Sequence, residues 1–477
     1  MATPAHTVFD SLHSGVAAAD VLATDRATPA ELAAKQRQRL ICLVQAALQH
    51  SPLYRQRLHG VSPATVRLDT LPVVTKGELM QRFDEWVCDP QLKLAELRAF
   101  TADPLRIAEP YLGKYVVWES SGTSGQPGVF VQDARAMATY DALEALRRSV
   151  PQPLKRWLDP MYLSERIAFV GATTGHFASY VSIQRLCQLN PWVAQVMRSL
   201  SILQSTASLI EALDAYAPTI ISTYPTVAAL LADEAARGAL RHRPNEVWTG
   251  GETLSPGVRK WVEKSLHCAV RNSYGASEFL TIGWECGQGH MHANTDWLIL
   301  EPVDEKFRSV RPGQECHTTL LTNLVNTVQP LIRYDLGDQV SFGRQRCACG
   351  SPLPVIEVAG RHDDALTMLD QHGRPVTLLP LALTTVLEDQ AAVFEFQLRQ
   401  LDGHTLELSL PQSGAEATSM MVRCRHVLQG LAHQHGLAPI KLIGKCGVTL
   451  PRGRSGKVQR VVAAHPAGAL AGRGPQM

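Results

Sequence analysis

Between about Tyr115 and Val340 the chain alternates short apolar runs with helical stretches, and this alternation limits the folds open to it. The apolar runs include "RIAFVGAT", "TIISTY" and "NEVWTGG", and "TVAALLADEAARG" between two of them is typical of a helix. This pattern predicts an α/β domain whose ligands bind where the strands end. Because 477 residues exceed one ordinary core, we expect two or three domains.

The pattern changes on either side of this region. Near the start, residues 28–50 begin with Thr28, Pro29 and Glu31, a capping-box order that predicts an amphipathic helix. After residue 360, "LPLALTTVLED", the strand-like "VFEFQLRQL" and "TLELSLP", and a helix around "MMVRCRHVLQGLAHQHG" predict a small α+β unit. We therefore expect a large N-terminal domain at 1–361, a small C-terminal domain at 362–464, and an Ala/Gly/Pro-rich tail at 465–477 without fixed structure.

Charge and composition exclude several classes of partner. The chain has 46 basic and 44 acidic residues, a net charge of +2, which gives no electrostatic footprint for nucleic acid or a membrane surface. We find no apolar run as long as a membrane helix and no signal-peptide order at the start, so we expect a cytoplasmic protein. The ten cysteines are then expected to be reduced thiols rather than a disulfide framework.

The stretch "ESSGTSGQPG", from Glu119 to Gly128, is rich in glycine and in serine and threonine hydroxyls. Such a loop can approach an anion closely and donate hydrogen bonds to it, so it is a candidate phosphate loop. The spacing of Gly122 and Gly125, with Gln126 after them, excludes the Walker pattern. Taken alone, the stretch is equally compatible with a solvated turn between a strand at Tyr115–Glu119 and a helix from Ala134.

Further stretches follow the loop in a fixed order: "TGGETLS" (249–255), "NSYGASEF" (272–279), "IRYDLGD" (332–338) and "LPRGRSGKVQR" (450–460). In this order and spacing the sequence resembles the adenylate-forming superfamily of acyl-CoA synthetases and adenylation domains. The stretches "HSPLYRQRL" (50–58) and "LPVVTKGEL" (71–79), with the paired cysteines described below, resemble its phenylacetate-CoA ligase and coenzyme F390 synthetase branch. The resemblance implies a large N-terminal α/β domain and a small mobile C-terminal α+β domain.

The resemblance also implies a nucleotide site. It assigns Glu278 as the magnesium ligand, Ser277 as the hydroxyl near the α-phosphate, Tyr274 as the ring that stacks on adenine, and Asp338 as the acceptor for the ribose hydroxyls. Relatives usually carry lysine where this chain has Gln126. The residues implied to bind ATP or AMP are Ser120, Ser121, Gly122, Thr123, Ser124, Gly125, Gly251, Glu252, Tyr274, Gly275, Asp338 and Arg361.

The same resemblance assigns roles near the C-terminal domain. Lys457 matches the catalytic lysine, whose charge would bridge the substrate carboxylate and the α-phosphate during adenylation. Asp363 matches the hinge about which the small domain rotates before thioester formation. Lys457, Glu278 and Ser277 are therefore the expected catalytic residues.

Soft metal ligands gather in two loops. Cys347 and Cys349 stand two residues apart, and "ECGQGHMHANTD" offers Cys286 and His292, with His290 as a rival fourth ligand. Two thiolate-bearing loops would suit a closed, tetrahedral and therefore structural zinc site. The alternative is a set of reduced residues that holds no metal.

The acid pocket is expected where strands end near the α-phosphate. His176, Tyr224, Trp248, Gly250 and Gly251 would shape a flat slot suited to an aromatic acid. We expect ATP-dependent activation of that acid and thioester formation with coenzyme A, with ATP and Mg²⁺ required and the small-molecule acid as partner. Loading of an acyl carrier protein's phosphopantetheine, AMP transfer of the F390 synthetase kind and a homodimer all remain open.

Overall fold

The computed structural model describes residues 8–120, 127–148, 158–159, 164–314, 316–359, 365–393, 395–451 and 458–464. The chain divides into two compact units. Unit 1 comprises Met1–Ile202, Ala207–Arg361 and Arg454–Lys457, and unit 2 comprises Leu203–Thr206, His362–Gly453 and Val458–Met477. None of the described helices is long and apolar enough to cross a membrane.

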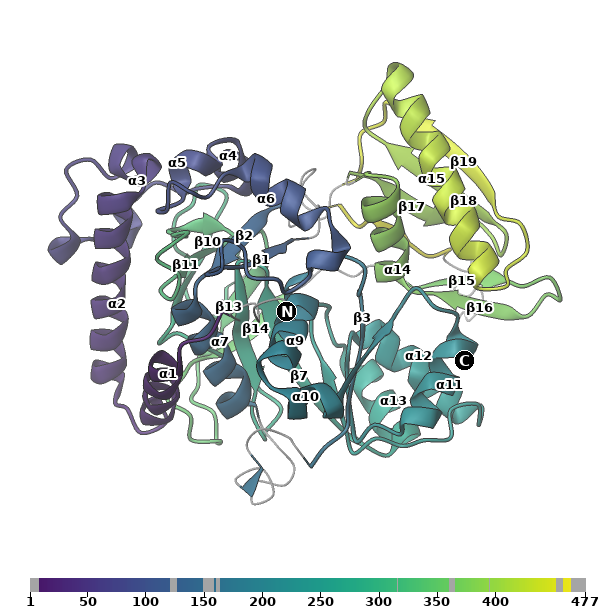
Figure 1. Ribbon diagram of the computed structural model, residues 1–477, viewed down its shortest axis with the longest axis horizontal. Coiled ribbons are helices and arrows are strands. Elements are labelled where there is room, and N and C mark those ends of the chain that lie inside the picture. The colour runs from purple at the N-terminus through teal and green to yellow at the C-terminus, as the bar shows by residue number, and fades with distance from the viewer. Residues whose placement is uncertain are drawn as a thin grey trace, which may run out of the picture. The chain divides into compact units, whose positions relative to one another are not determined.

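Unit 1 is built on a large mixed sheet (Figure 1). Within the described residues its strand order is β13-β14-β9-β8-β7-β6-β5-β3-β4. Strands β4, β3, β5, β6 and β7 are mutually parallel, and β7, β8, β9, β14 and β13 pair antiparallel. The bounds are β3 Ile167–Gly171, β4 Met197–Ser201, β5 Ile220–Thr223, β6 Glu246–Thr249, β7 Ala269–Ala276, β8 Phe279–Glu285, β9 Met291–Ala293, β13 Gln339–Phe342 and β14 Val355–Ala359.

Smaller sheets complete the β-structure of unit 1. Strands β1 and β2 form an antiparallel hairpin, and β10, β11 and β12 form an antiparallel sheet. Their bounds are β1 Val116–Glu119, β2 Val129–Gln132, β10 Leu298–Val303, β11 Thr318–Asn323 and β12 Tyr334–Asp335.

The helices of unit 1 connect and cover these strands. Helices α9 to α13 lie in the parallel half of the fold, whereas α1 to α6 precede the first strand. Their bounds are α1 Ser11–Thr24, α2 Pro29–His50, α3 Pro52–Arg57, α4 Lys76–Gln81, α5 Phe83–Trp86, α6 Leu94–Thr101, α7 Ala134–Arg147, α9 Ala178–Leu189, α10 Pro191–Val196, α11 Thr206–Tyr216, α12 Pro225–Ala236 and α13 Pro256–Leu266; short 3-10 helices are η1 Pro63–Thr65, η2 Leu68–Thr70 and η3 Pro104–Arg106.

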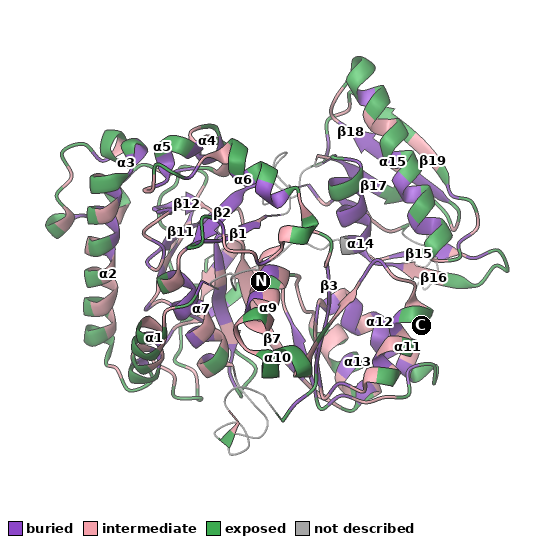
Figure 2. Cartoon of the chain, viewed as in Figure 1, coloured by how far each residue is buried: buried purple, intermediate pink, exposed green. Residues whose placement is uncertain are grey.

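Unit 2 is a separate α+β unit. Strands β19, β18, β17 and β20 form one sheet, and β15 and β16 form a hairpin. The outer face of its long helix α15 is exposed (Figure 2). The bounds are β15 Leu366–Leu369, β16 Pro375–Leu378, α14 Pro380–Thr385, the π-helix η4 Val386–Gln390, β17 Gln397–Gln400, β18 Thr405–Leu410, α15 Gly414–Gln434, β19 Lys441–Cys446 and β20 Val461–Val462.

The predicted elements are confirmed. The α/β class is correct for the large unit, and the elements expected after residue 360 are α14, β17, β18 and α15. The capping box of α2 forms as expected, because Thr28 Oγ1 accepts from the Glu31 backbone N–H at 3.3 Å and Glu31 Oε2 accepts from the Thr28 N–H at 2.7 Å. This pairing satisfies helix donors that would otherwise lack partners.

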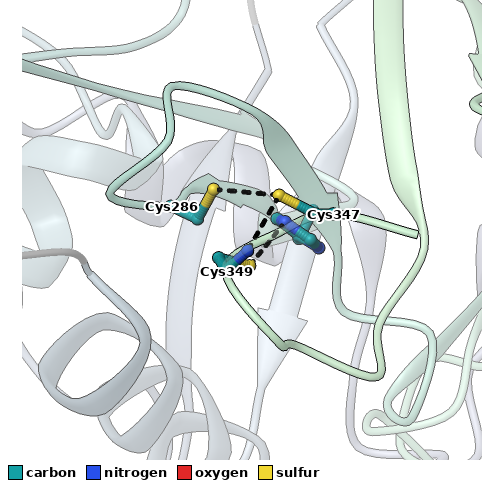
Figure 3. A group of neighbouring side chains, drawn as sticks. Cys286, Cys347 and Cys349 are labelled. Atoms are coloured by element: carbon teal, nitrogen blue, oxygen red, sulfur yellow. Dashed lines mark hydrogen bonds between the residues drawn. The ribbon is translucent and has the colours of Figure 1, made fainter. Parts of the chain in front are cut away.

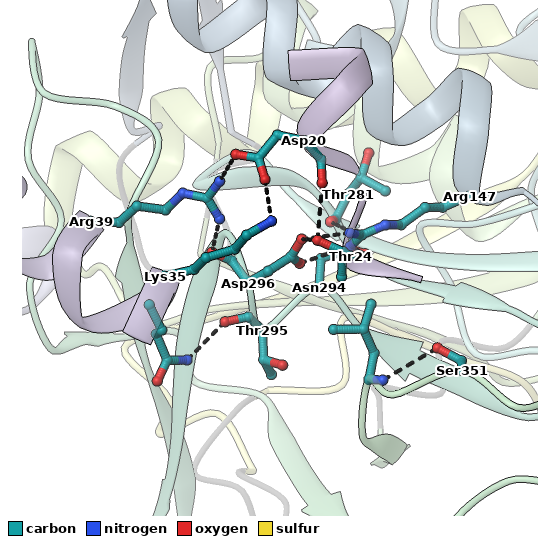
Figure 4. A network of polar contacts seen from close by, with 12 residues as sticks. Asp20, Thr24, Lys35, Arg39, Arg147, Thr281, Asn294, Thr295, Asp296 and Ser351 are labelled. Carbon is teal, nitrogen blue, oxygen red and sulfur yellow. Dashed lines mark hydrogen bonds and ion pairs between the residues drawn. The ribbon is translucent and has the colours of Figure 1, made fainter. Parts of the chain in front are cut away.

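A buried ion pair fixes the N-terminal helices to the sheet region (Figure 4). Arg147 and Asp296 lie 2.5 Å apart, with side chains 2% and 0% exposed. Thr24 at the end of α1 donates to Asp296 at 3.0 Å, and Asn294 accepts from Arg147 at 2.6 Å. Because each charge is hydrogen-bonded, the pair can be buried without an uncompensated charge.

Candidate functional site

The carboxyl ends of β5, β6 and β7 meet at one edge of the sheet, since these strands are parallel. Tyr224 follows β5, the stretch Gly250–Glu252 follows β6, and Tyr274 to Glu278 lie at and after the end of β7. In open α/β sheets such an edge is where ligands bind. The fold therefore brings most of the described site residues together at one edge.

The paired strands β1 and β2 flank the Ser/Gly-rich stretch in the chain. Its base is closed by hydrogen bonds from the Ser120 N–H to the Gly128 carbonyl at 2.8 Å and from the Gly128 N–H to Ser120 Oγ at 2.9 Å. Strand β2 was missing from the expectation of a strand, a loop and a helix. The loop residues Ser121, Gly122, Thr123, Ser124, Gly125 and Gln126 lie outside the described residues, as do Arg361, Asp363 and Lys457.

The base of this loop is joined to the end of β7. Trp118 of β1 is fully buried, and its indole N–H donates to the Ser277 carbonyl at 2.8 Å. A buried indole with its polar atom satisfied is a rigid connection. Ser120 and Ser277, both expected near phosphate, are therefore held on neighbouring backbones.

Tyr274 and Asp338 form the first of two tyrosine–carboxylate pairs. The Tyr274 hydroxyl donates to Asp338 Oδ2 at 2.8 Å. Burial, with the neighbouring Asp338 charge, raises the pKa of Tyr274 well above its ordinary value, so this phenol stays protonated and remains a donor. The two residues expected at adenine and ribose are 64 positions apart in sequence and in direct contact in space.

Glu278 belongs to the second pair, and its partner was not foreseen. The Tyr334 hydroxyl donates to Glu278 Oε1 at 2.6 Å, and the Asn323 side chain donates to the Glu278 carbonyl at 3.0 Å. Tyr334 and Glu278 are 3% and 8% exposed. Tyr334 lies in "IRYDLGD", four residues before Asp338, but nothing in that motif shows that its hydroxyl reaches Glu278.

The tight bend between these two pairs requires glycine at position 275. A Cβ at this position would lie 1.9 Å from the Leu280 carbonyl oxygen, so only glycine fits without moving the backbone. The strand pairing of β7 and β8 shifts register at the same place, between Tyr274 and Ala276. A register shift of this kind redirects side chains and is common beside functional sites.

The residues expected to shape the acid slot lie in different surroundings. Gly251 has φ +77°, and a Cβ there would lie 3.1 Å from the Tyr224 ring. Burial raises the pKa of Tyr224 to about 12. Glu252 accepts from the backbone N–H of Thr226 at 3.0 Å and from its hydroxyl at 3.1 Å, and so caps α12.

Trp248 and His176 are both buried. The Trp248 indole N–H donates to Glu246 at 2.9 Å, and the Arg148 guanidinium lies 4.2 Å from its ring centroid. His176 is 1% exposed and lies 5.5 Å from the Phe100 ring centroid. Neither His176 nitrogen makes a hydrogen bond of normal geometry within the described residues, and burial lowers its pKa.

The predicted metal ligands converge on one point. The ligand atoms of Cys286, His292, Cys347 and Cys349 all lie within 4.8 Å of one another. Cys286 follows β8 and His292 lies in β9, whereas Cys347 and Cys349 come from the segment between β13 and β14. The labelled cysteines point toward one another (Figure 3).

The contacts around these side chains are those of a ligand set. The sulfurs of Cys286 and Cys347 are 3.7 Å apart, and Cys349 Sγ is 3.4 Å from His292 Nε2. Backbone N–H groups point at the sulfurs, and the bond from Cys349 N–H lowers the pKa of Cys347 to about 6, whereas burial raises that of Cys349 to about 11. His292 Nδ1 lies 2.8 Å from the Leu353 carbonyl, which leaves Nε2 for the cluster.

His290 stays outside the closed set. Its Nδ1 lies 3.3 Å from Cys347 Sγ, but its side chain is exposed, whereas His292 is fully buried. His292 is therefore the better placed of the two rival fourth ligands.

Sequence comparison identifies the segment that carries these features. Residues 115–312 match the AMP-binding enzyme family. The matched segment contains the β1–β2 hairpin, the parallel strands and Tyr274 to Glu278. Protein CapK of Staphylococcus aureus is 26% identical over 161 residues, 33% of this chain and 34% of CapK, so the similarity spans about a third of that relative.

The fold also matches solved structures of a 2-hydroxyisobutyryl-CoA ligase. The complex with 2-HIB-AMP and CoA in the thioesterification state gives a TM-score of 0.56 at 19% identity and covers 91% of this chain and 90% of that chain. The postadenylation state with 2-HIB-AMP gives 0.52 at 19% identity, covering 90% and 89%. The chain therefore has the fold of an adenylate-forming enzyme with a C-terminal domain.

Proposed function

We propose that the protein is an AMP-forming acid–thiol ligase. It would use ATP to convert a carboxylic acid into an acyl-adenylate, release pyrophosphate, and then transfer the acyl group to the thiol of coenzyme A with release of AMP. The observation that carries this proposal is the arrangement of Tyr274–Asp338 and Tyr334–Glu278 as two hydrogen-bonded pairs beside the end of β7. The match of residues 115–312 to the AMP-binding enzyme family supports the proposal.

The nucleoside would lie along the Tyr274–Asp338 pair. The hydrogen bond fixes the position of the Tyr274 phenol, so its ring is a rigid platform for adenine. A carboxylate accepts several hydrogen bonds, so Asp338 can hold the Tyr274 hydroxyl and still accept from the ribose hydroxyls. The two residues would thus be oriented for the nucleotide before it binds.

Glu278 would be the carboxylate that holds Mg²⁺. Mg²⁺ prefers oxygen ligands, and a carboxylate that accepts from Tyr334 on one oxygen keeps capacity for a metal. When bound, Mg²⁺ would neutralise charge that accumulates on the phosphates. Ser277, Ser120 and the loop residues 121–125 would donate hydrogen bonds to the same anion.

The remaining roles follow the motif order. Lys457 would supply a positive charge during adenylation, and Asp363 would be the hinge that removes it before thioester formation. Arg361 would contact the nucleotide. His176, Tyr224, Gly250 and Gly251 would surround an aromatic acid, with Trp248 beneath them, as in a phenylacetate-CoA ligase-like enzyme.

We also propose that Cys286, His292, Cys347 and Cys349 hold one structural zinc ion. The donor set has the composition of a closed tetrahedral site, and the Leu353 carbonyl orients His292 as metal-bound histidines require. The ion would join the end of β8 to the segment after β13. Glu278 comes directly before β8 and Asp338 directly before β13, so the ion would tie together the far ends of the two strands that begin at these residues.

ATP–pyrophosphate exchange tests the proposal directly. Purified protein is incubated with ATP, Mg²⁺, labelled pyrophosphate and one carboxylic acid at a time, aromatic acids first. Acid-dependent exchange is expected, and thioester should form on addition of coenzyme A. Exchange without thioester formation would indicate a carrier protein, rather than coenzyme A, as the acceptor. If none of the acids supports exchange, the proposed ligase function is rejected.

A further inference from the structure

The segment that carries Tyr334 is paired on both of its edges. On one edge Tyr334 pairs with Leu321 of β11. On the other edge it forms a parallel bridge with Val74, where the Val74 N–H donates to the Arg333 carbonyl at 3.1 Å and the Asp335 N–H donates to the Val74 carbonyl at 2.9 Å. The stretch "LPVVTKGEL" (71–79) therefore borders β12 and extends the sheet of β10, β11 and β12 by one bridge.

The stretch "HSPLYRQRL" (50–58) contacts the same region. The buried Tyr54 hydroxyl accepts from the Ile332 backbone N–H at 3.2 Å. Arg57 donates to the Val73 carbonyl at 3.0 Å and forms an ion pair with Glu78. Both N-terminal stretches, which the proposed function leaves without a role, therefore converge on the start of β12.

Arg333, directly before β12, has a constrained backbone. Its φ is +50°, in the left-handed region that residues other than glycine seldom adopt. Such a conformation costs free energy and persists where its surroundings hold it. Here the Arg333 backbone N–H donates to Thr322 Oγ1 at 3.0 Å, and its carbonyl accepts from Val74. The conformation of Arg333 therefore determines how the chain enters β12, and with it the direction of the next side chain, Tyr334.

The guanidinium of Arg333 joins two further segments. Its Nη1 donates to the Leu71 carbonyl at 2.5 Å, and its Nε donates to Glu301 Oε2 of β10 at 3.3 Å. The Arg333 and Glu301 side chains are 6% and 12% exposed, so solvent screens this ion pair little. The guanidinium therefore holds the left-handed backbone between the 71–79 stretch and β10.

Glu278 lies on the opposite face of the same sheet. Tyr334 and Asn323 share that face, and both donate to Glu278, the tyrosine to the carboxylate and the asparagine to the backbone carbonyl. Glu301 is one position out of line with Tyr334 in the strand register, and successive side chains alternate, so Glu301 lies on the other face. Arg333, which contacts Glu301, therefore holds β12 from the face away from Glu278.

We propose that Arg333 is a positioning residue for adenylation. Its guanidinium holds the start of β12 against β10 and the 71–79 stretch, so that the Tyr334 hydroxyl reaches Glu278. The two N-terminal stretches are the support to which Arg333 is tied. Arg333 acts through Tyr334 and touches neither the acid nor the nucleotide. This inference rests on the proposed ligase function.

Arg333→Gly tests this role, because glycine adopts a positive φ without strain and only the side-chain anchor is lost. We expect kcat/KM for ATP–pyrophosphate exchange to fall about tenfold or more, with a higher Mg²⁺ requirement, the change also expected of Tyr334→Phe. Arg333→Lys keeps the charge but not the fixed fork, and should recover part of the rate. Arg185→Lys is the matched control. Arg185 is 1% exposed and is bonded to Asp141 and to the Val8 carbonyl, so this variant should keep the native exchange rate and Mg²⁺ requirement.

A double-mutant cycle shows whether Arg333 acts through the Tyr334 hydroxyl. In folded Arg333→Gly protein, adding Tyr334→Phe should lower kcat/KM by less than about twofold, because the hydrogen bond to Glu278 is already lost. Urea unfolding without nucleotide or Mg²⁺ gives a readout that is independent of activity. There, the stability lost through Tyr334→Phe should be less than about half of the loss in the native background. If Arg333→Gly does not fold, the same cycle is made with Arg333→Lys.

Circular dichroism and a melting curve check that each variant is folded. Additive losses in either measurement, or a folded Arg333→Gly enzyme with native Mg²⁺ dependence, would overturn the positioning role and leave the ligase intact. Native protein that shows no exchange with any acid would instead reject the ligase and the role in adenylation together.

Discussion

Tyr334→Phe removes one hydroxyl and so tests whether Tyr334 positions Glu278. The lost hydrogen bond spans 2.6 Å to a carboxylate that is 8% exposed. Hydrogen bonds to charged groups contribute about 1.5–3 kcal/mol, and neutral ones about 0.5–1.5 kcal/mol. The free energy of unfolding should therefore fall by about 2 kcal/mol. Tyr216→Phe, which removes a bond to the Val196 carbonyl, should cost about 1 kcal/mol.

The exchange activity of Tyr334→Phe distinguishes a loss of Glu278 orientation from a loss of protein stability. If the Glu278 carboxylate loses its orientation, kcat/KM for ATP–pyrophosphate exchange should fall about 10- to 100-fold, which corresponds to the same energy range. The loss should be largest at low Mg²⁺ and partly reversed at high Mg²⁺. Tyr216→Phe should keep the native exchange rate and Mg²⁺ dependence. A Tyr334→Phe enzyme with native Mg²⁺ dependence and a rate within twofold of native would refute the reasoning.

Further predictions concern the lysine, the zinc ligands and His176. Lys457→Ala should abolish exchange but retain part of thioester formation from supplied acyl-adenylate, and equal loss of both half-reactions would contradict its role. Cys347→Ser should lower zinc content and melting temperature before it affects the chemistry; metal analysis of native protein purified without chelator should give about one zinc per chain, and less than about half would reject the site. Burial lowers the pKa of His176 below 6.5, so protonation favours the unfolded state. Stability should therefore decline as pH falls below about 6.5, and urea unfolding of His176→Phe at several pH values should show a smaller decline.

Local signals in the sequence predict much of the fold. Thr28, Pro29 and Glu31 define the start of α2 because capping is a local interaction, and the strands β3, β5 and β6 follow from short apolar runs. The antiparallel half of the sheet was not predicted. Its strands are short and paired across long distances, as with β9 and β14, and no local pattern fixes such pairing.

The metal cluster and the tyrosine pairs show where sequence reasoning succeeds and fails. Cysteine and histidine are rare and chemically distinct, so their grouping near Cys286 and Cys347 was informative before the loops were seen together. Tyrosine is common in cores, and the contact of Tyr334 with Glu278 joins residues 56 positions apart. Only the packing of β12 beside the end of β7 reveals that the hydroxyl meets a carboxylate.

Tertiary packing also gives predicted residues surroundings that composition did not suggest. Glu252 was expected at the nucleotide, and it caps α12 through Thr226. Trp248 was expected to line a slot, and its ring lies in a small cluster with Ile167 and Ile220. Strand alternation decides which face a side chain occupies, and this requires the register of β6, which the motif alone does not give.

Acid-dependent ATP–pyrophosphate exchange, measured with the native protein and with Glu278→Gln, is the most direct test of the central claim. In the native protein, exchange should require both an acid and Mg²⁺. In Glu278→Gln it should fall by at least about 100-fold, because the residue that holds Mg²⁺ is lost and with it the neutralisation of the phosphate charge. Glu246→Gln, whose carboxylate accepts from the Trp248 indole within the same strand β6, serves as the control and should retain exchange. Native protein without exchange for any acid, or a folded Glu278→Gln enzyme with undiminished exchange, would contradict the account.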